Sequence, residues 1–203
     1  MTDKIILTEK LLLGKGAHKK VYLDPTDAYH CIKVPFEIPD EDLEKELRYR
    51  NSREKRHLKS RLLTAYYGTI DTNLGTGYIF ERVQDYDGKT SRSFKDLFEQ
   101  AAADVAMCPF IEEMMQKCKA MLFQELIVTS NMEDGNFVLQ RISETEYTIR
   151  IIDNIGSPVF FPLAYYFDFF ARKRTVKYWK RFLDNLQRWY AKVMTEELKN
   201  RLL

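Results

Sequence analysis

The sequence has few cysteines and no long apolar segment. Its 203 residues include three cysteines, too few and too widely spaced for a disulfide framework or a zinc site: Cys31, Cys108 and Cys118. The most hydrophobic window, residues 159–171, is shorter than a bilayer span and contains a proline and an aspartate. The N-terminus has neither the apolar run nor the cleavage site of a signal peptide. These absences predict a cytoplasmic protein.

The chain also lacks a large excess of charge of either sign. Lysine and arginine total 32 against 30 for aspartate and glutamate, a formal net charge of +2. Nucleic-acid-binding domains are strongly basic, so nucleic acid is not an expected partner. Two local stretches are basic, Arg48–Arg61 and Arg172–Arg181, and a solvated helix face is the ordinary explanation for each. The second stretch follows the aromatic run Val159–Phe170, so a peripheral membrane contact stays open as an alternative.

What is present is the composition of one globular domain, with 45% hydrophobic and 31% charged residues. Alternating apolar residues separated by turn residues predict five strands in the first half of the chain. The acidic segment after Pro39 predicts a helix between the third and fourth strands, because proline and acids favour a first helical turn. The predicted strands are 5–13, 21–23, 28–34, 66–70 and 77–83.

The second half of the chain has mostly helical periodicity. Apolar residues at three- and four-residue spacing predict helices over 93–103, 111–126 and 176–193. A hairpin is predicted from the strands 137–141 and 148–152. The sequence therefore predicts an α+β protein in which a β-rich part is followed by a helical part.

Three pairs of residues along the chain are candidates for a binding or catalytic site, and the first two pairs lie in the β-rich part. Gly14 and Gly16 lie between two predicted strands, where backbone N–H groups can approach phosphates, although the pair alone also fits a plain hairpin turn. Lys33 interrupts the apolar alternation of the third strand, and Glu46 lies beside leucines on the inner helix face. Taken alone, each of these two residues is explained more simply as a charged side chain exposed to solvent. Together they fit a glutamate that holds an ammonium group against nucleotide phosphates.

The third pair is an amide and a carboxylate at the two ends of the predicted hairpin, Asn136 and Asp153. Each alone is more often a turn residue. Paired at the mouth of a cleft, they offer oxygen ligands for Mg²⁺, which binds few protein ligands together with phosphates. The order of all three pairs along the chain favours a nucleotide site.

These motifs resemble the protein-kinase-like superfamily and, within it, the YrbL family of PhoP regulatory network proteins. The resemblance runs from about Leu13 to Trp179. Its most specific parts are Gly-Thr-Gly-Tyr at 75–78 and Asp-Asn-Ile-Gly at 153–156. The other matching segments are Leu13–Lys20, Cys31–Lys33, Glu46–Tyr49, Asp85–Gly88, Ile127–Thr129 and Asn136.

The resemblance implies a bilobal protein-kinase-like fold of the α+β class in one domain, residues 1–203. It implies a five-stranded N-lobe at 1–84, a hinge at 81–88 and a reduced, mostly helical C-lobe at 89–203. The implied ligands are ATP, or another purine nucleotide, and Mg²⁺. The implied nucleotide-binding residues are Gly14, Gly16, Val21, Lys33, Glu81 and Val83, and the implied Mg²⁺ ligands are Asn136 and Asp153.

The implied catalytic residues are Lys33, Glu46, Asn131 and Asp153, and this set departs from the kinase pattern. Asn131 stands where the catalytic aspartate is expected, and an amide cannot act as a general base. Losing a general base costs typically about 10²–10⁴ in rate, so slow transfer stays compatible with the sequence. Lys19 replaces the third glycine of the loop, and no Ala-Pro-Glu motif follows Asp153.

Three hypotheses follow from this pattern. The first is an atypical phosphotransferase that acts on a small molecule, and less readily on a protein, because the segment that binds peptide substrates in kinases is not visible. The second is a pseudokinase, a nucleotide-gated regulatory or binding module without turnover, which Asn131 favours. The third is a surface-binding protein that uses residues 172–181.

Overall fold

A five-stranded antiparallel sheet forms the N-terminal part of the protein. The computed structural model describes residues 4–158 and 162–203. The strand order is β1-β2-β3-β5-β4, so β5 pairs with both β3 and β4. The last four predicted strands are therefore present, and the first strand begins later than predicted; the bounds are β1 Leu12–Lys15, β2 Lys19–Leu23, β3 His30–Pro35, β4 Tyr66–Thr72 and β5 Gly75–Glu81.

Helix α1, Glu41–Lys55, follows β3, as the acidic segment predicts. Asp40 caps it, because its carboxylate accepts two backbone N–H groups of the first turn. The helix packs on one face of the sheet, where Leu43 joins Cys31 and Phe80 in an apolar cluster. This packing fixes α1 beside β3 and β5.

The other face of the sheet is covered by the chain that precedes β1. Ile32 and Val34 alternate with Cys31 and Lys33 along β3, and they pack with Leu7 in a second cluster. Because side chains alternate across a strand, Lys33 lies on the same side as Cys31, toward α1. The polar residue is thus placed on the inner face by strand geometry alone.

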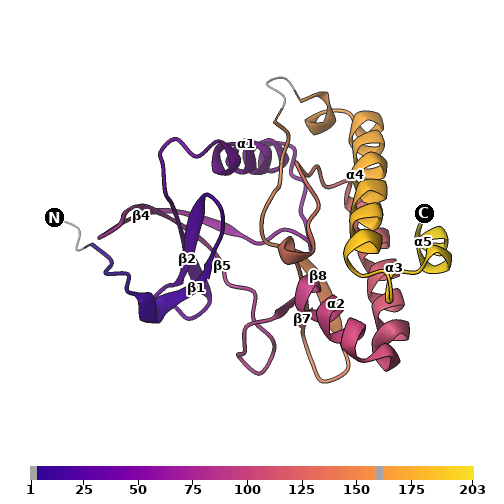
Figure 1. The fold of residues 1–203 in the computed structure, drawn as a ribbon. Helices are drawn as coiled ribbons and strands as arrows, with labels where there is room; N and C mark the ends of the chain where they lie inside the picture. The colour runs from indigo at the N-terminus through magenta and orange to yellow at the C-terminus, as the bar shows by residue number, and fades with distance from the viewer. Residues whose placement is uncertain (1–3, 159–161) are drawn as a thin grey trace.

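The C-terminal part combines a small sheet with helices (Figure 1). The sheet has three strands in the order β6-β7-β8. Its strands are β6 Arg92–Ser93, β7 Phe137–Arg141 and β8 Tyr147–Ile151. The helices are α2 Phe94–Ala103, α3 Cys108–Glu125, α4 Asp168–Trp189 and α5 Glu196–Leu202, with short 3-10 helices η2 Val105–Met107, η3 Asp134–Asn136 and η4 Leu163–Tyr165.

The largest apolar core lies within this C-terminal part. Phe98, Met114, Phe137 and Trp179 are almost completely buried in it and come from α2, α3, β7 and α4. The apolar stripe of α3 is therefore a core-facing stripe. Tyr49 of α1 belongs to the same cluster, so α1 packs against both parts of the protein.

Two predicted boundaries are wrong. The strand expected over residues 5–13 is largely absent, because the 3-10 helix η1, Glu9–Leu11, interrupts it; Leu7 before this helix is buried against the sheet, and Leu11 at its end is partly buried. The first strand begins only at Leu12 and includes Gly14. The last long helix, α4, ends at Trp189, and the buried Val193 lies in the turn that follows. Residues 159–161 of the aromatic run lie outside the described residues.

Candidate functional site

Lys33 is a buried lysine with three kinds of electron-rich partner. Its side chain lies on β3, and 4% of the residue is exposed. The Nζ atom donates to the Ile152 carbonyl at 2.7 Å and lies 3.5 Å from Glu46 Oε2. It also lies 4.1 Å from the centre of the Phe80 ring. A buried ammonium group is costly unless paired, so these contacts explain how the sheet tolerates the charge.

Glu46 uses both carboxylate oxygens in the interior, where 1% of the residue is exposed. Oε2 faces Lys33, and Oε1 accepts from Arg50 Nε at 2.9 Å and from Arg50 Nη2 at 2.6 Å. Arg50 in turn donates to the Thr64 hydroxyl at 3.3 Å and to the Thr64 carbonyl. The structure thus brings Lys33 and Glu46 together and adds Arg50 as a second cation.

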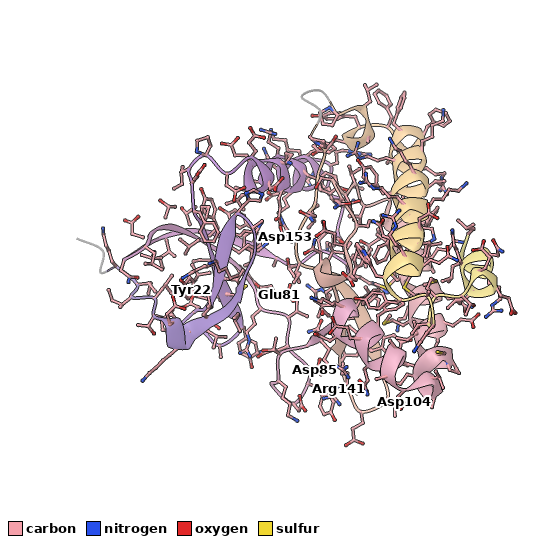
Figure 2. The ribbon with its side chains drawn as sticks, in the orientation of Figure 1. Tyr22, Glu81, Asp85, Asp104, Arg141 and Asp153 are labelled. Carbon is pink, nitrogen blue, oxygen red and sulfur yellow. The ribbon has the colours of Figure 1, made fainter. Side chains whose placement is uncertain are left out.

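Asp153 follows β8 and faces two lysines from the five-stranded sheet (Figure 2). Its Oδ1 atom lies 2.8 Å from Lys19 Nζ and 3.9 Å from Lys33 Nζ, and it accepts from the Asn154 N–H at 3.0 Å. Burial alone would raise the pKa of Asp153, but Lys33 and Lys19 hold that pKa below its ordinary value. The group is therefore a carboxylate surrounded by positive charge.

Two asparagines lie on the segment that leads to β7. Asn136 ends η3, and its carbonyl accepts from the Ile152 N–H at 3.0 Å, which ties it to the residue before Asp153. Asn131 donates from Nδ2 to Glu133 Oε1 at 2.6 Å. The structure brings Asn136, Asn131 and Asp153 to one cavity, although no direct contact joins their side chains among the described bonds.

A cavity of about 230 Å³ lies between the five-stranded sheet and the C-terminal part. Its walls are largely apolar, and Lys33, Asn136 and Asp153 also line it. Burial raises the pKa of the Cys31 thiol to about 11, so this wall residue is an uncharged, apolar surface. Of the predicted nucleotide-binding residues, the cavity is lined by Gly14, Val21, Lys33, Glu81 and Val83.

A second cavity, of about 480 Å³, adjoins the first through two shared lining residues, Asn136 and Asp153. Its lining is mostly polar and includes Gly16, Lys19 and Asn131. The predicted site residues are thus distributed over an apolar compartment and a polar compartment that meet at one carboxylate. Glu46 lines neither cavity and acts through its ion pair with Lys33.

The segment after β5 is held in place by Asp85 (Figure 2). The Asp85 carboxylate accepts from Ser91 Oγ at 2.5 Å, from Arg141 Nε at 2.7 Å and from the Arg141 N–H at 3.0 Å. These bonds join the predicted hinge, residues 81–88, to the β7–β8 hairpin. They fix the wall of the cavity that Glu81 and Val83 form.

Asp85 is expected to contribute stability that disappears in acid. Burial alone would raise its pKa, but the bonds from Ser91 and Arg141 lower it below the ordinary value of 3.8. The contribution is therefore complete above the unfolded-state pKa and is lost as the pH falls through the lower folded-state value. In urea titrations between about pH 5 and pH 2, the stability difference between wild type and Asp85→Asn should shrink as the pH falls. A difference that stays constant would contradict this assignment.

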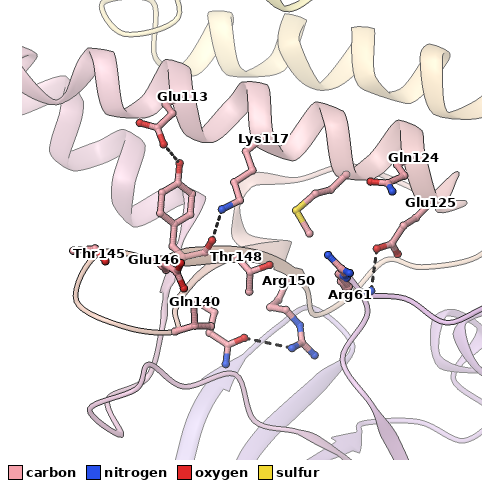
Figure 3. Close-up of a pocket in the computed structure, with 13 residues that line it drawn as sticks. Arg61, Glu113, Lys117, Gln124, Glu125, Gln140, Thr145, Glu146, Thr148 and Arg150 are labelled. Atoms are coloured by element: carbon pink, nitrogen blue, oxygen red, sulfur yellow. Dashed lines mark hydrogen bonds between the residues drawn. The ribbon is translucent and has the colours of Figure 1, made fainter.

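A larger hollow of about 940 Å³ lies on another side, between α3 and the β7–β8 hairpin (Figure 3). Its polar groups bond mainly to one another. Glu113 accepts from the Tyr147 hydroxyl at 2.8 Å, and Lys117 donates to the Tyr147 carbonyl. Glu125 accepts from the Arg61 N–H at 2.9 Å. Size alone does not make this hollow the candidate site, because most of its charged side chains, those of Glu113, Lys117, Glu125 and Arg150, already have partners.

The two basic stretches differ in structure. In the first, Arg53 is 8% exposed and donates to the Glu125 carbonyl at 3.3 Å and to the Lys59 carbonyl at 3.0 Å. Arg50 is held by Glu46. The prediction of a uniformly solvated face is therefore wrong for these two arginines, which attach α1 to the rest of the protein. The exposed cations of the second stretch are Arg172, Lys173, Lys177, Lys180 and Arg181.

Sequence reasoning assigned no role in the site to Arg50 or to Lys19. The spacing of Arg50, four residues after Glu46 on a helix, indicates the ion pair and could have identified it. Lys19 pairs with a residue 134 positions away, and no local pattern encodes such a partner. The presence of a lysine in place of the loop's third glycine marks Lys19 as unusual, but it does not identify Asp153 as the partner.

The fold and cavities define a mixed α+β protein whose five-stranded sheet and C-terminal part share a cleft lined by Lys33 and Asp153. The family model described as PhoP regulatory network protein YrbL matches residues 5–187, and the chain belongs to this family. The protein named YrbL in Escherichia coli K12 is 33% identical over 189 residues, which cover 88% of this chain and 86% of the relative. The YrbL of Shigella flexneri matches with the same identity and coverage.

No helix within residues 4–158 and 162–203 is long and apolar enough to cross a membrane. The same ranges contain no group of three or more histidine, cysteine, aspartate or glutamate residues arranged to hold a metal ion.

Proposed function

We propose that the protein has a bilobal kinase-like fold and binds a purine nucleotide with Mg²⁺ between its lobes. In this proposal the N-lobe is residues 1–84, the hinge is 81–88 and the C-lobe is 89–203. The observation that carries the proposal is the buried Lys33, held 3.5 Å from Glu46 and 3.9 Å from Asp153 beside a largely apolar cavity. Phosphoryl-transfer sites use such a lysine, positioned by a glutamate, to contact phosphates.

The two compartments fit the two halves of a nucleotide. The apolar walls suit a purine base, and the Val83 N–H at the cavity edge, which no described bond uses, would donate to it. Lys33 would contact the phosphates, while Asn136 and Asp153 supply the oxygen ligands that Mg²⁺ prefers. Bound Mg²⁺ neutralises phosphate charge. Glu46 is a positioning residue, because its contact is with Lys33 and Arg50.

The glycines of the loop also favour a ligand. Neither Gly14 nor Gly16 has a positive φ angle. A Cβ at Gly14 would meet no protein atom within 4 Å, and one at Gly16 would make an ordinary contact of 3.6 Å with the Lys19 carbonyl. The described fold does not itself require glycine at either position. A ligand that lies close to the loop backbone would require glycine there, because a side chain would block its approach. Glycines are commonly found beside bound phosphates for this reason.

The two nucleotide hypotheses differ in how they account for Asn131. An acceptor hydroxyl loses its proton when the phosphoryl group is transferred, and the Asn131 amide cannot take that proton. We propose an atypical phosphotransferase on a small molecule, which relies on positioning and electrostatics and is slow. The alternative is a pseudokinase that binds nucleotide as a regulatory signal. In both, the contacts of Lys33, Glu46 and Asp153 are the same.

The nucleotide site is tested by thermal unfolding with ATP and Mg²⁺. A ligand at about one hundred times its Kd adds about 2.7 kcal/mol of stability. A domain of this size gains roughly 2–4 °C per kcal/mol, so ATP with Mg²⁺ should raise the Tm by about 5–10 °C. Lys33→Ala should abolish this rise, and Asp153→Ala should abolish the part of it that depends on Mg²⁺. The matched control is Lys20→Ala on the same sheet, whose ammonium group pairs with the exposed Glu9 at 2.8 Å.

The comparison uses the rise in Tm for each variant, since the substitutions also change the starting Tm. No rise in wild type with any nucleotide would overturn the proposal, and so would a rise that persists unchanged in Lys33→Ala. Release of ADP in the presence of candidate acceptors separates the two hypotheses. Release that Asp153→Ala abolishes supports a phosphotransferase, and binding without release supports the pseudokinase.

A further inference from the structure

Lys19 is the residue of the cleft that the proposed function does not use. It is the first residue of β2, at the position where a nucleotide-binding loop has its third glycine. It is 7% exposed, although lysine is rarely buried unless it is paired. Its ammonium group lies 2.8 Å from Asp153 Oδ1, a distance typical of a direct charge-assisted hydrogen bond. The bond connects the loop to the end of β8 across the cleft.

The same carboxylate oxygen is crowded with donors. Asp153 Oδ1 also accepts from the Asn154 N–H at 3.0 Å, and Lys33 Nζ lies 3.9 Å away. Two ammonium groups thus lie within 4 Å of one oxygen of the carboxylate that is proposed to hold Mg²⁺. A divalent cation cannot occupy this oxygen without displacing Lys19, because like charges at such distances repel strongly in a partly buried site.

Lys19 also lines the polar compartment, together with Gly16 and Lys45. From this position its long, flexible side chain can exchange the Asp153 carboxylate for a phosphate oxygen with a rotation of its own bonds. Without a cation at Asp153, the carboxylate would repel the phosphates of an entering nucleotide. Lys19 removes that repulsion whichever of the two anions it contacts.

We propose that Lys19 is a phosphate-binding residue that serves as a tethered counter-ion of Asp153, so that a nucleoside polyphosphate can bind without a divalent metal ion. Mg²⁺ and the Lys19 ammonium group are then alternatives at the same carboxylate. This inference rests on the proposed nucleotide site. It adds that the dependence of nucleotide binding on metal is set by one side chain of the loop.

The inference is tested by measuring the Kd of ATP by calorimetry in Mg²⁺ and in EDTA. The informative quantity is the ratio of the Kd in EDTA to the Kd in Mg²⁺. Lys19→Met keeps the apolar stem of the side chain and removes the charge. We expect this variant to raise the ratio by about tenfold or more, because Asp153 then repels metal-free ATP. Lys19→Arg, which keeps the charge, should stay close to wild type.

Lys20→Met is the matched control, since Lys20 is the next residue of the strand and pairs with Glu9 away from Asp153. Its ratio should equal that of wild type. A general loss of fold in Lys19→Met would weaken both Kd values together and leave the ratio unchanged, whereas the proposed role changes the ratio.

The outcomes separate this inference from the function on which it rests. If wild type binds ATP, and Lys19→Met keeps a Kd in Mg²⁺ close to that of wild type but leaves the ratio unchanged or lowers it, the counter-ion role is wrong and the nucleotide site stands. If wild type binds ATP in neither condition, the proposed nucleotide site is wrong, and the role of Lys19 falls with it.

Discussion

Glu46→Ala is expected to lower the free energy of unfolding by about 3–5 kcal/mol, which is the usual cost of removing one partner from a buried ion pair. Glu46 is 1% exposed, and its loss leaves both Lys33 and Arg50 without their carboxylate. Lys33 then has to share Asp153 with Lys19, and Arg50 keeps only the uncharged oxygens of Thr64, so two interior cations lose negative charge that water cannot replace. Unfolding in urea, followed by circular dichroism, measures the change.

The matched control is Glu44→Ala on the same helix. Glu44 has 52% of its side chain exposed and lies 3.7 Å from Arg48. Exposed pairs of this kind contribute about 0–1 kcal/mol, so the control should change stability little. Glu46→Gln should lie between the two, because an amide oxygen still accepts from Arg50 but carries no charge. Equal stability of Glu46→Ala and Glu44→Ala would show that the interior pair does not stabilise the fold.

Gly156→Ala is expected to destabilise the protein by about 2–5 kcal/mol, the sum of backbone strain and overpacking. Gly156 has φ of +97°, which is unfavourable for alanine. A Cβ there would lie 2.7 Å from the Lys45 carbonyl oxygen and 2.9 Å from the Tyr165 hydroxyl oxygen. Both distances are shorter than van der Waals contact, and the Lys45 carbonyl belongs to α1. The substitution therefore displaces the helix that carries Glu46.

Gly88→Ala separates strain from overpacking. Gly88 also has a positive φ, of +79°, but a Cβ there would meet nothing within 4 Å. It should cost only the conformational part, about 1–2 kcal/mol. Calorimetric unfolding of both variants gives the comparison. If the two variants are equally stable, the contact between residue 156 and α1 is unimportant, and the account of how the site is assembled is incorrect.

The sequence predicted the secondary structure well where the pattern is local. Alternation and helical spacing located four of the five strands, α1 and α3, because burial of one face imposes a period that is visible in the residues. The first strand was misplaced because the 3-10 helix Glu9–Leu11 interrupts the segment, and the few apolar residues of so short a segment, such as Leu7 and Leu11, do not distinguish a strand from a helical turn.

The site was predictable in part. Lys33 and Glu46 each lie at a position where an unpaired charge is unfavourable, and this made both residues recognisable in the sequence. Because burying an unpaired charge costs free energy, the two side chains pair with each other in the structure. The contact of Lys19 with Asp153 could not be inferred in this way. In the sequence, Lys19 falls in the polar segment before the predicted strand 21–23, where a lysine is common. Its partner is determined by the tertiary fold alone.

Helix α1 is anchored to the C-terminal part at its far end as well as to the sheet. The Tyr49 hydroxyl accepts from the Val128 N–H at 3.0 Å, and Arg53 donates to carbonyls of residues 59 and 125. An outward swing of α1 would break these buried bonds together with the Lys33–Glu46 pair. The arrangement therefore favours a pre-assembled site, with Lys33 aligned before any ligand arrives. At the start of β2, by contrast, one side-chain bond described within residues 4–158 and 162–203 reaches across the cleft, that of Lys19 with Asp153, so this end of the sheet can move at a far smaller cost.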